Sequence, residues 1–172
     1  MTDTPRKAAT LKRSVKELIA TAQRAVRTVD ICLRADLVDE YELLEARIAK
    51  AKEAAQESLG GVDTGAMEAR MAELRAEMAE NSVTFRIRGL PKREFAELAS
   101  QYPPREDNQR DAFVGFNLDE VVEQLIRRGT EEPVLDEDDW LALLGEALNT
   151  ATYEKLTAAA WAVNKVDVSA PF

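Results

Sequence analysis

The chain has 172 residues, 45% hydrophobic and 32% charged, a balance that excludes a disordered chain and indicates one or two globular or coiled domains. Its formal net charge of -9 argues against nucleic acid as a partner, because a duplex-binding protein presents a basic face. There is no run of about 18 apolar residues, so we expect neither a membrane span nor a membrane partner.

The first predicted element is a long helix over residues 10–59, a stretch without proline or glycine. Its apolar residues recur in steps of three and four, which is the spacing of one helical stripe. They are Leu11, Val15, Leu18, Ala22, Ala25, Val29, Leu33, Leu37, Tyr41, Leu44, Ile48, Ala51, Ala55 and Leu59. Unbroken, this helix would be about 75 Å long. Four-residue steps run together between Val29 and Leu37, so an interruption there stays open.

The start of this helix is basic. Residues 1–27 hold seven Lys and Arg against two acidic residues, Asp3 and Glu17. Such a run is typical of a solvated helix face or a frayed terminus, and an arm that binds phosphate or a membrane surface is the alternative. Because the second half of the chain is acidic, charge-matched association between copies, giving a homo-oligomer, is also open.

A second helix follows Gly60-Gly61, where glycine suits the left-handed residue that closes a helix. Asp63 or Thr64 can cap it. Its apolar stripe consists of Met67, Met71, Leu74 and Met78. Since a helix of about three turns is marginal alone, we expect it to fold back on the first helix as an antiparallel hairpin. Its methionines are candidates for partner binding, with hairpin filler as the competing interpretation.

The segment "SVTFRIRGLP", residues 82–91, alternates as a half-buried strand with Val83, Phe85 and Ile87 on one face. One strand cannot satisfy its own backbone groups, so it needs another strand, from residues 166–172, another copy or a partner. We therefore count the strand edge around Phe85 and Ile87 as a second candidate partner-binding surface.

The rest of the chain is predicted to form four short helices. Pro91 suits the start of the first, and Pro103 ends it. The strip "REDNQRD", residues 105–111, is predicted to be a solvated loop, and Phe113 and Phe116 are predicted to tie this corner into the core. The remaining helices begin at Asn117, at Asp136, and at Asn149 or Thr150, all suited to cap a helix.

These patterns predict a mainly α fold: an elongated helical hairpin or coiled coil over residues 1–82, then a compact, mostly helical domain with one short strand over residues 83–172. All aromatic residues except Tyr41 fall in the second part, and aromatic side chains fill compact cores.

Catalysis is not expected. The chain has no histidine, which removes the commonest general base and a frequent metal ligand. The acidic runs lack the glycine and closing glutamate of a calcium loop, so helix capping explains them better. Its single cysteine, Cys32, cannot form an internal disulfide and suits a reducing cytoplasm. We expect no catalytic residue, no metal and no cofactor.

Residues 83–166 resemble tail assembly chaperones of long-tailed phages and prophages of actinobacteria. The resemblance rests on five short motifs in a fixed order. They are Leu90-Pro91-Lys92, Tyr102-Pro103-Pro104-Arg105, Gly115-Phe116-Asn117, Asp138-Asp139-Trp140 and Ala162-Val163-Asn164. Gln101-Tyr102 stands where the family often has histidine before the prolines. The resemblance implies a non-catalytic helper in the host bacterial cytoplasm that keeps the tape-measure protein, or another helical tail protein, soluble during tail assembly.

Three hypotheses follow from the sequence. The first is a chaperone that sequesters a helical client, with Met67, Met71, Met78, Phe85 and Ile87 as candidate contacts. The second is a structural or scaffold component of the virion that oligomerises through its N-terminal helices. The third is an enzyme using tyrosine or carboxylates, for which the spacing of residues suggests no site.

Overall fold

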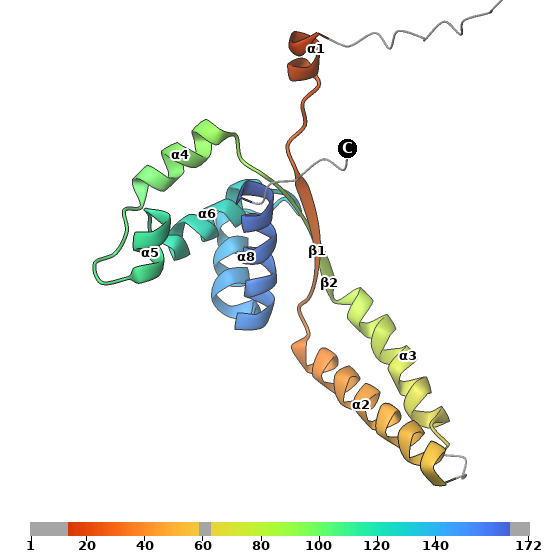
Figure 1. Ribbon diagram of the computed structural model, residues 1–172. Helices are drawn as coiled ribbons and strands as arrows, with labels where there is room; N and C mark the ends of the chain where they lie inside the picture. The colour runs from red at the N-terminus through yellow and green to blue at the C-terminus, as the bar shows by residue number, and fades with distance from the viewer. Residues whose placement is uncertain (1–13, 59–62, 166–172) are drawn as a thin grey trace, which may run out of the picture.

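The computed structural model describes residues 14–58 and 63–165, and these form a mostly helical body with a small antiparallel sheet and a projecting helical hairpin (Figure 1). The expected turn at Gly60-Gly61, the residues before Ser14 and the segment 166–172 lie outside the described residues.

The long first helix was predicted wrongly. Residues 14–58 form a short helix α1 (Val15–Ala20), a strand β1 (Val26–Cys32) and a helix α2 (Ala35–Ser58). Ser14 caps the N-terminus of α1 with a capping box, in which its side chain accepts from the Glu17 N–H. The break falls partly in the interval where an interruption had been left open, and a strand fills it.

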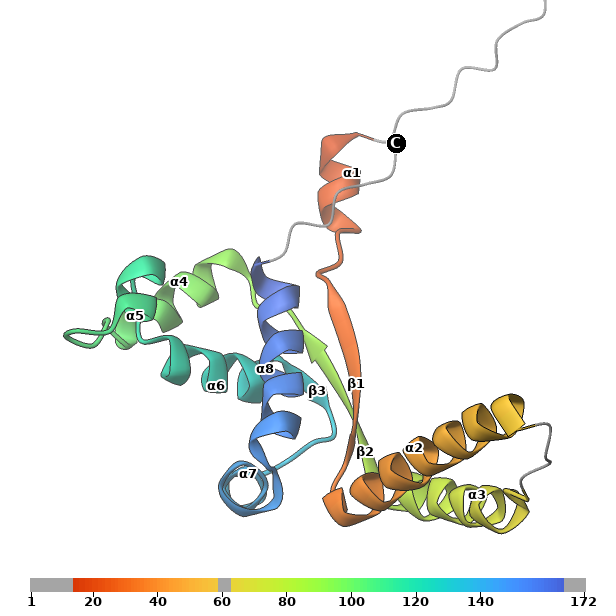
Figure 2. The same ribbon diagram turned by 60° about the horizontal axis from the view of Figure 1, so that its bottom comes forward.

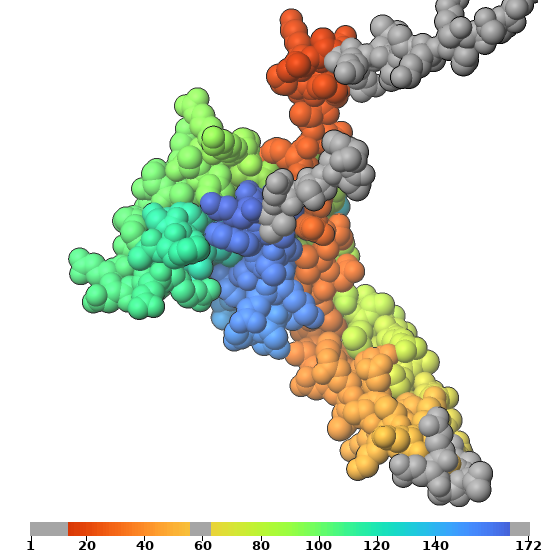
Figure 3. Space-filling model, viewed as in Figure 1, coloured from red at the N-terminus to blue at the C-terminus, as the bar shows by residue number. Residues whose placement is uncertain are grey.

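The expected helical hairpin is present, formed by α2 and α3 (Gly65–Glu80) lying side by side (Figures 1 and 2). Its small core consists of Leu37, Ile48, Met71 and Leu74. The guanidinium of Arg70 on α3 joins the two helices by pairing with Glu40 at 2.9 Å. The hairpin projects away from the rest of the molecule (Figure 3).

The sheet has three strands where one was predicted. Strand β2 (Ser82–Arg88) lies in the centre, between β1 and the short β3 (Thr130–Glu132), and both pairings are antiparallel. In the β1–β2 register Val26 faces Arg88 and Cys32 faces Ser82. The predicted division at Ser82 therefore separates β1 from its neighbour in the sheet. Whether residues 1–82 and 83–172 are separate folding units stays a prediction.

The remaining helices pack against this sheet or against one another. They are α4 (Lys92–Gln101), α5 (Gln109–Val114), α6 (Leu118–Gly129), α7 (Glu137–Ala142), the π-helical turn η1 (Leu143–Ala147) and α8 (Thr150–Lys165). With the three strands they make up what we call the sheet body. Helix α8 packs across β1 and β2, and α6 packs against α8 (Figure 2).

The core of the sheet body joins strand and helix residues. It contains Ile31, Phe85, Ile87, Leu98, Phe116, Val121, Val122, Leu125, Ile126, Trp140, Leu143, Leu156 and Ala160. The caps predicted at Asn117 and Asp136 are confirmed: Asn117 accepts from the Glu120 N–H at 3.4 Å, and Asp136 accepts from the Asp139 N–H at 2.8 Å. They start α6 and α7, which carry much of this core.

Candidate functional site

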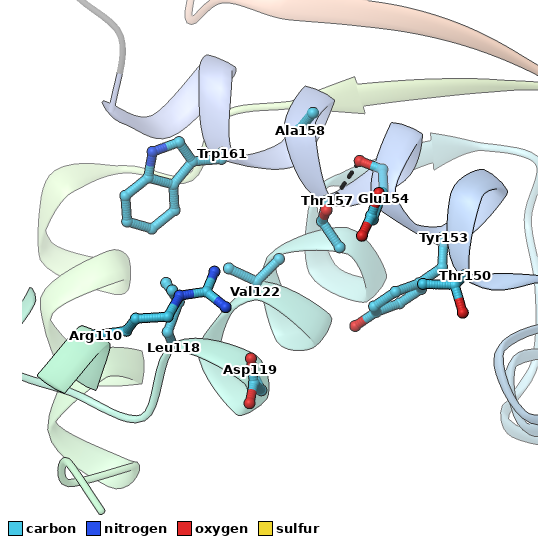
Figure 4. Close-up of a pocket in the computed structure, with 10 residues that line it drawn as sticks. All are labelled: Arg110, Leu118, Asp119, Val122, Thr150, Tyr153, Glu154, Thr157, Ala158 and Trp161. Carbon is cyan, nitrogen blue, oxygen red and sulfur yellow. Dashed lines mark hydrogen bonds between the residues drawn. The ribbon is translucent and has the colours of Figure 1, made fainter. Parts of the chain in front are cut away.

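A groove of about 580 Å³ opens between α6 and α8, with α5 at one end (Figure 4). Its lining is apolar at the bottom and polar along the rim. The lining residues are Arg110, Leu118, Asp119, Val122, Thr150, Tyr153, Glu154, Thr157, Ala158 and Trp161. A hollow of this size and character is the usual form of a binding site in a helical domain.

The two aromatic residues of the groove come from the same face of α8. Tyr153 and Trp161 are eight residues apart, a little over two turns, so they lie about 12 Å from one another along the helix, toward the two ends of the groove (Figure 4). Both are half-buried, and Trp161 is held from behind by Phe116, whose ring centroid is 6.5 Å away. A supported, partly exposed aromatic surface is a common anchor for protein partners.

The rim is acidic on the side of α6. Burial raises the pKa of the Tyr153 hydroxyl above its usual value, and the carboxylates of Glu123, Asp119 and Glu120 raise it further. Asp119 also pairs with Arg105 at 2.8 Å. The Tyr153 hydroxyl therefore stays protonated at neutral pH, and the field at this end of the groove favours a cation.

Arg110 is the basic residue of the lining, and its side chain forms no hydrogen bond or ion pair with any residue of the described ranges. In Figure 4 its guanidinium extends from α5 toward the interior of the groove. The groove thus offers the guanidinium of Arg110 and the carboxylates of Asp119 and Glu154 beside its apolar residues.

A second hollow of about 290 Å³ continues the groove past Arg110 and Leu118, which line both. Phe113 borders it and is 91% exposed. The prediction that Phe113 enters the core was wrong, whereas Phe116 is buried at 4% exposure as predicted. A fully exposed phenylalanine beside an apolar hollow is the type of feature that marks a contact surface.

The corner that carries Phe113 is held by a buried carboxylate. Asp111 Oδ2 accepts from Arg105 Nε at 2.7 Å, and Oδ1 accepts from the Leu118 N–H at 3.1 Å. These bonds, the guanidinium's above all, hold the pKa of Asp111 well below its usual range. The charged strip 105–111 is therefore not wholly solvated as predicted, because Asp111 is fully buried.

The residues predicted as contacts lie elsewhere, at two separate places. Phe85 and Ile87 are buried in the core at 1% and 0% exposure, and Phe85 contacts Trp140 with ring centroids 6.5 Å apart. On one edge β2 pairs with β1 along its whole length, whereas on the other edge β3 pairs only with Arg86 and Ile87. Strand addition at the edge near Phe85 therefore stays a prediction.

The methionines belong to the hairpin. Met71 is buried between α2 and α3, whereas Met67 and Met78 are half-buried. A shallow hollow of about 260 Å³ lies beside Met71 and Ile48, rimmed by the Lys52–Glu68 ion pair at 2.9 Å. Met71 is thus part of the hairpin core, and partner binding by the methionines stays a prediction.

The groove left little signal in the sequence. Leu118 and Val122 of its apolar floor are four residues apart on α6, which is also the spacing of a buried helix face, and Trp161 comes from another helix, α8. The exposure of Phe113 could not be predicted from the local sequence, because aromatic residues are more often buried.

Among the described residues there is neither a candidate metal cluster nor a helix that could span a membrane. No group of three or more His, Cys, Asp or Glu side chains in residues 14–58 and 63–165 is arranged to hold a metal ion. Over the same residues, every helix is too short or too polar to cross a bilayer.

Comparison with protein-family models, curated proteins and solved structures finds no match to this chain.

Proposed function

We propose that the protein is a non-catalytic tail assembly chaperone, which holds the tape-measure protein or another helical tail protein soluble until the tail forms. The observation that supports this most is the fully exposed Phe113 beside the groove of α6 and α8. The family resemblance of residues 83–166 suggests the client.

The shape of the groove suits one face of an amphipathic helix. It runs between two helices, and α8 with its 16 residues is about 24 Å long. A client helix laid along it would place apolar residues at i, i+3 or i+4, and i+7. These would contact Trp161, Val122 and Phe113 in turn.

Charge would select among helical clients. Asp119 and Glu154 line the groove, and Glu120 and Glu123 lie beside Tyr153. A client with lysine or arginine beside its apolar stripe would be favoured at this acidic end of the groove. The net charge of -9 on the chain would keep the complex soluble while the client waits for assembly.

The test compares two exposed apolar residues. Phe113→Ala removes the proposed contact, and Val134→Ala is the matched control, because both side chains are 91% exposed. Each variant is co-expressed with the tape-measure protein of the same phage, and the soluble fraction of that client is measured. We expect a loss of about tenfold in client retained by Phe113→Ala and none by Val134→Ala. Equal retention by both variants would contradict the site.

A second pair of variants fills the groove. Ala158 is exposed and lines it, whereas Ala96 on α4 is exposed and does not. Ala158→Arg should block client retention and Ala96→Arg should leave it intact, with unchanged melting in both. A client retained equally by the two arginine variants would exclude the groove. A protein found in purified particles at fixed stoichiometry would favour a virion component over a chaperone.

A further inference from the structure

Strand β1 has one unpaired edge within the described part of the chain. Backbone bonds from Gly89 N–H to Ala25 C=O at 3.0 Å and from Leu33 N–H to Asn81 C=O at 2.9 Å show that the odd-numbered residues of β1 bond to β2. In an antiparallel strand the alternate residues then direct their N–H and C=O groups the other way. These outward residues are Val26, Thr28, Asp30 and Cys32.

No residue of the described ranges pairs with this outer edge, since β1 ends the sheet. Thr28 and Asp30 are exposed. A seven-residue edge with several β-branched residues and no proline is a ready surface for another strand. Natural proteins protect such an edge with charges or cover it, or they pair it with another strand.

We infer that this edge binds the same edge of a second copy, so that two β1 strands pair antiparallel about a two-fold axis at Val29 and form a continuous six-stranded sheet. This inference does not depend on client binding, and the groove of α6 and α8 takes no part in it.

We place the two-fold axis at Val29 because of the residues that would then face one another across the two β1 strands. With the axis there, Thr28 lies opposite Asp30 of the second copy, and this pair occurs twice by symmetry. The Thr28 hydroxyl can donate to that carboxylate, as the Thr84 hydroxyl already does to Asp30 at 2.6 Å within one chain. All seven residues of β1 then have a partner.

Shifted registers are less favourable. An axis at Asp30 places two carboxylates face to face, and an axis at Arg27 does the same with two guanidinium groups, which is destabilising for directly opposed residues. An axis at Thr28 avoids both but pairs only residues 26–30. Among these registers, the one with its axis at Val29 is therefore the most favourable.

Helix α1 supports the same arrangement. It lies beyond the start of β1, away from the sheet body, and buries no residue (Figures 1 and 3). Its apolar residues are largely exposed: Val15 at 72%, Leu18 at 52% and Ile19 at 70%. In the proposed register, residue 23 of one copy faces residue 35 of the other. The arm carrying α1 is thus directed toward the start of the second copy's α2, near Leu33, which is 38% exposed.

A charge exchange tests the pairing. Thr28→Asp places a new carboxylate opposite Asp30 of the second copy, and by symmetry this repulsive pair occurs twice. Within its own chain the new carboxylate faces Arg86, so the variant should still fold. Adding Asp30→Thr restores an aspartate–threonine pair. Light scattering of the full chain should give twice the chain mass of 19.1 kDa for wild type. The single variant should dimerise about tenfold more weakly, and the double variant should recover.

A cysteine pair tests the register. Cys32 lies opposite Val26 of the second copy, so Val26→Cys should give a covalent dimer under mild oxidation with diamide. Within one chain these positions are about 20 Å apart, too far to join. Thr28→Cys is the matched control on the same edge and face, and it should cross-link far less because Asp30 faces it.

Three results would each overturn the inference. A single-chain mass for wild type at concentrations up to about 100 micromolar, the range of weak dimers, would overturn the inference and leave the edge to a different extended segment. Equal cross-linking of the two cysteine variants would overturn it as well. A dimer that ignores Thr28→Asp would place the contact elsewhere and would equally overturn it. Each of these failures leaves the client-binding test with Phe113→Ala unaffected.

Discussion

Gly89 and Asn164 join the end of β2 to the last turn of α8. The Leu90 N–H donates to the side-chain oxygen of Asn164 at 2.8 Å, and the amide of Asn164 donates to the Ala160 carbonyl at 2.7 Å. A Cβ added at Gly89 would overlap the carbonyl oxygen of Val163. Two of the motifs that carry the family resemblance therefore meet at one contact, and their role here is structural.

This contact gives a residue-scale prediction. Gly89→Ala should lower the free energy of unfolding by about 1–3 kcal/mol, because backbone on both sides must move apart. Urea denaturation measures the loss. Gly145→Ala is the control, since a Cβ there meets nothing within 4 Å, and its change should stay within about 0.5 kcal/mol. Equal losses in the two variants would show that α8 is not packed tightly against Gly89.

At the scale of elements, one carboxylate positions the corner between α4 and α6. Asp111, at the start of α5, binds Arg105 from the preceding loop and the first N–H of α6. On a helix, residues two positions apart are separated by about 200°, so a buried Asp111 turns Phe113 outward. The exposed Phe113 of the proposed client site is thus a consequence of the buried Asp111.

The lowered pKa of Asp111 predicts a pH dependence. The unfolded carboxyl takes up its proton near pH 4, above the folded pKa, so the stabilisation is complete above about pH 4 and is lost as the pH falls below it. Asp111→Asn should lower the melting temperature at pH 7 by roughly 10 °C, with a smaller difference at pH 3. Asp107→Asn, an exposed carboxylate of the same loop, should change melting little at either pH. A constant gap between wild type and Asp111→Asn at both pH values would contradict this account.

Local signals predicted the helix caps and the α2–α3 hairpin but not β1. Ala25, Val29 and Leu33 are four residues apart, and positions four apart share a face in a strand as well as in a helix. The β-branched residues of β1 favoured a strand, but the residue that faces Asp30 lies 54 positions later. A partner strand that distant cannot be recognised in a local sequence pattern. The inward orientation of the Asp111 side chain could not be recognised there either.

At the scale of the whole molecule, the α2–α3 hairpin is an insertion between two paired strands. Leu33 and Asn81 remain joined by a backbone bond of 2.9 Å, although 47 residues separate them in the sequence. The buried residues of the hairpin, Leu37, Ile48, Met71 and Leu74, do not belong to the core cluster of the sheet body. The sheet body therefore owes little of its packing to the hairpin and much to β1, whose Ile31 is fully buried.

Two shortened chains test this division against the one at Ser82. Replacing residues 34–80 by Asn-Gly joins Leu33 to Asn81 through a two-residue turn and keeps β1 beside β2. The fluorescence of Trp140 and Trp161, both in the sheet body, should then report one cooperative transition within a few degrees of wild type. A fragment of residues 83–172 lacks β1, leaves that edge of β2 unpaired and loses Ile31, so it should melt broadly or not at all. If that fragment melts cooperatively and the chain without the hairpin is molten, the result would support the boundary at Ser82 instead.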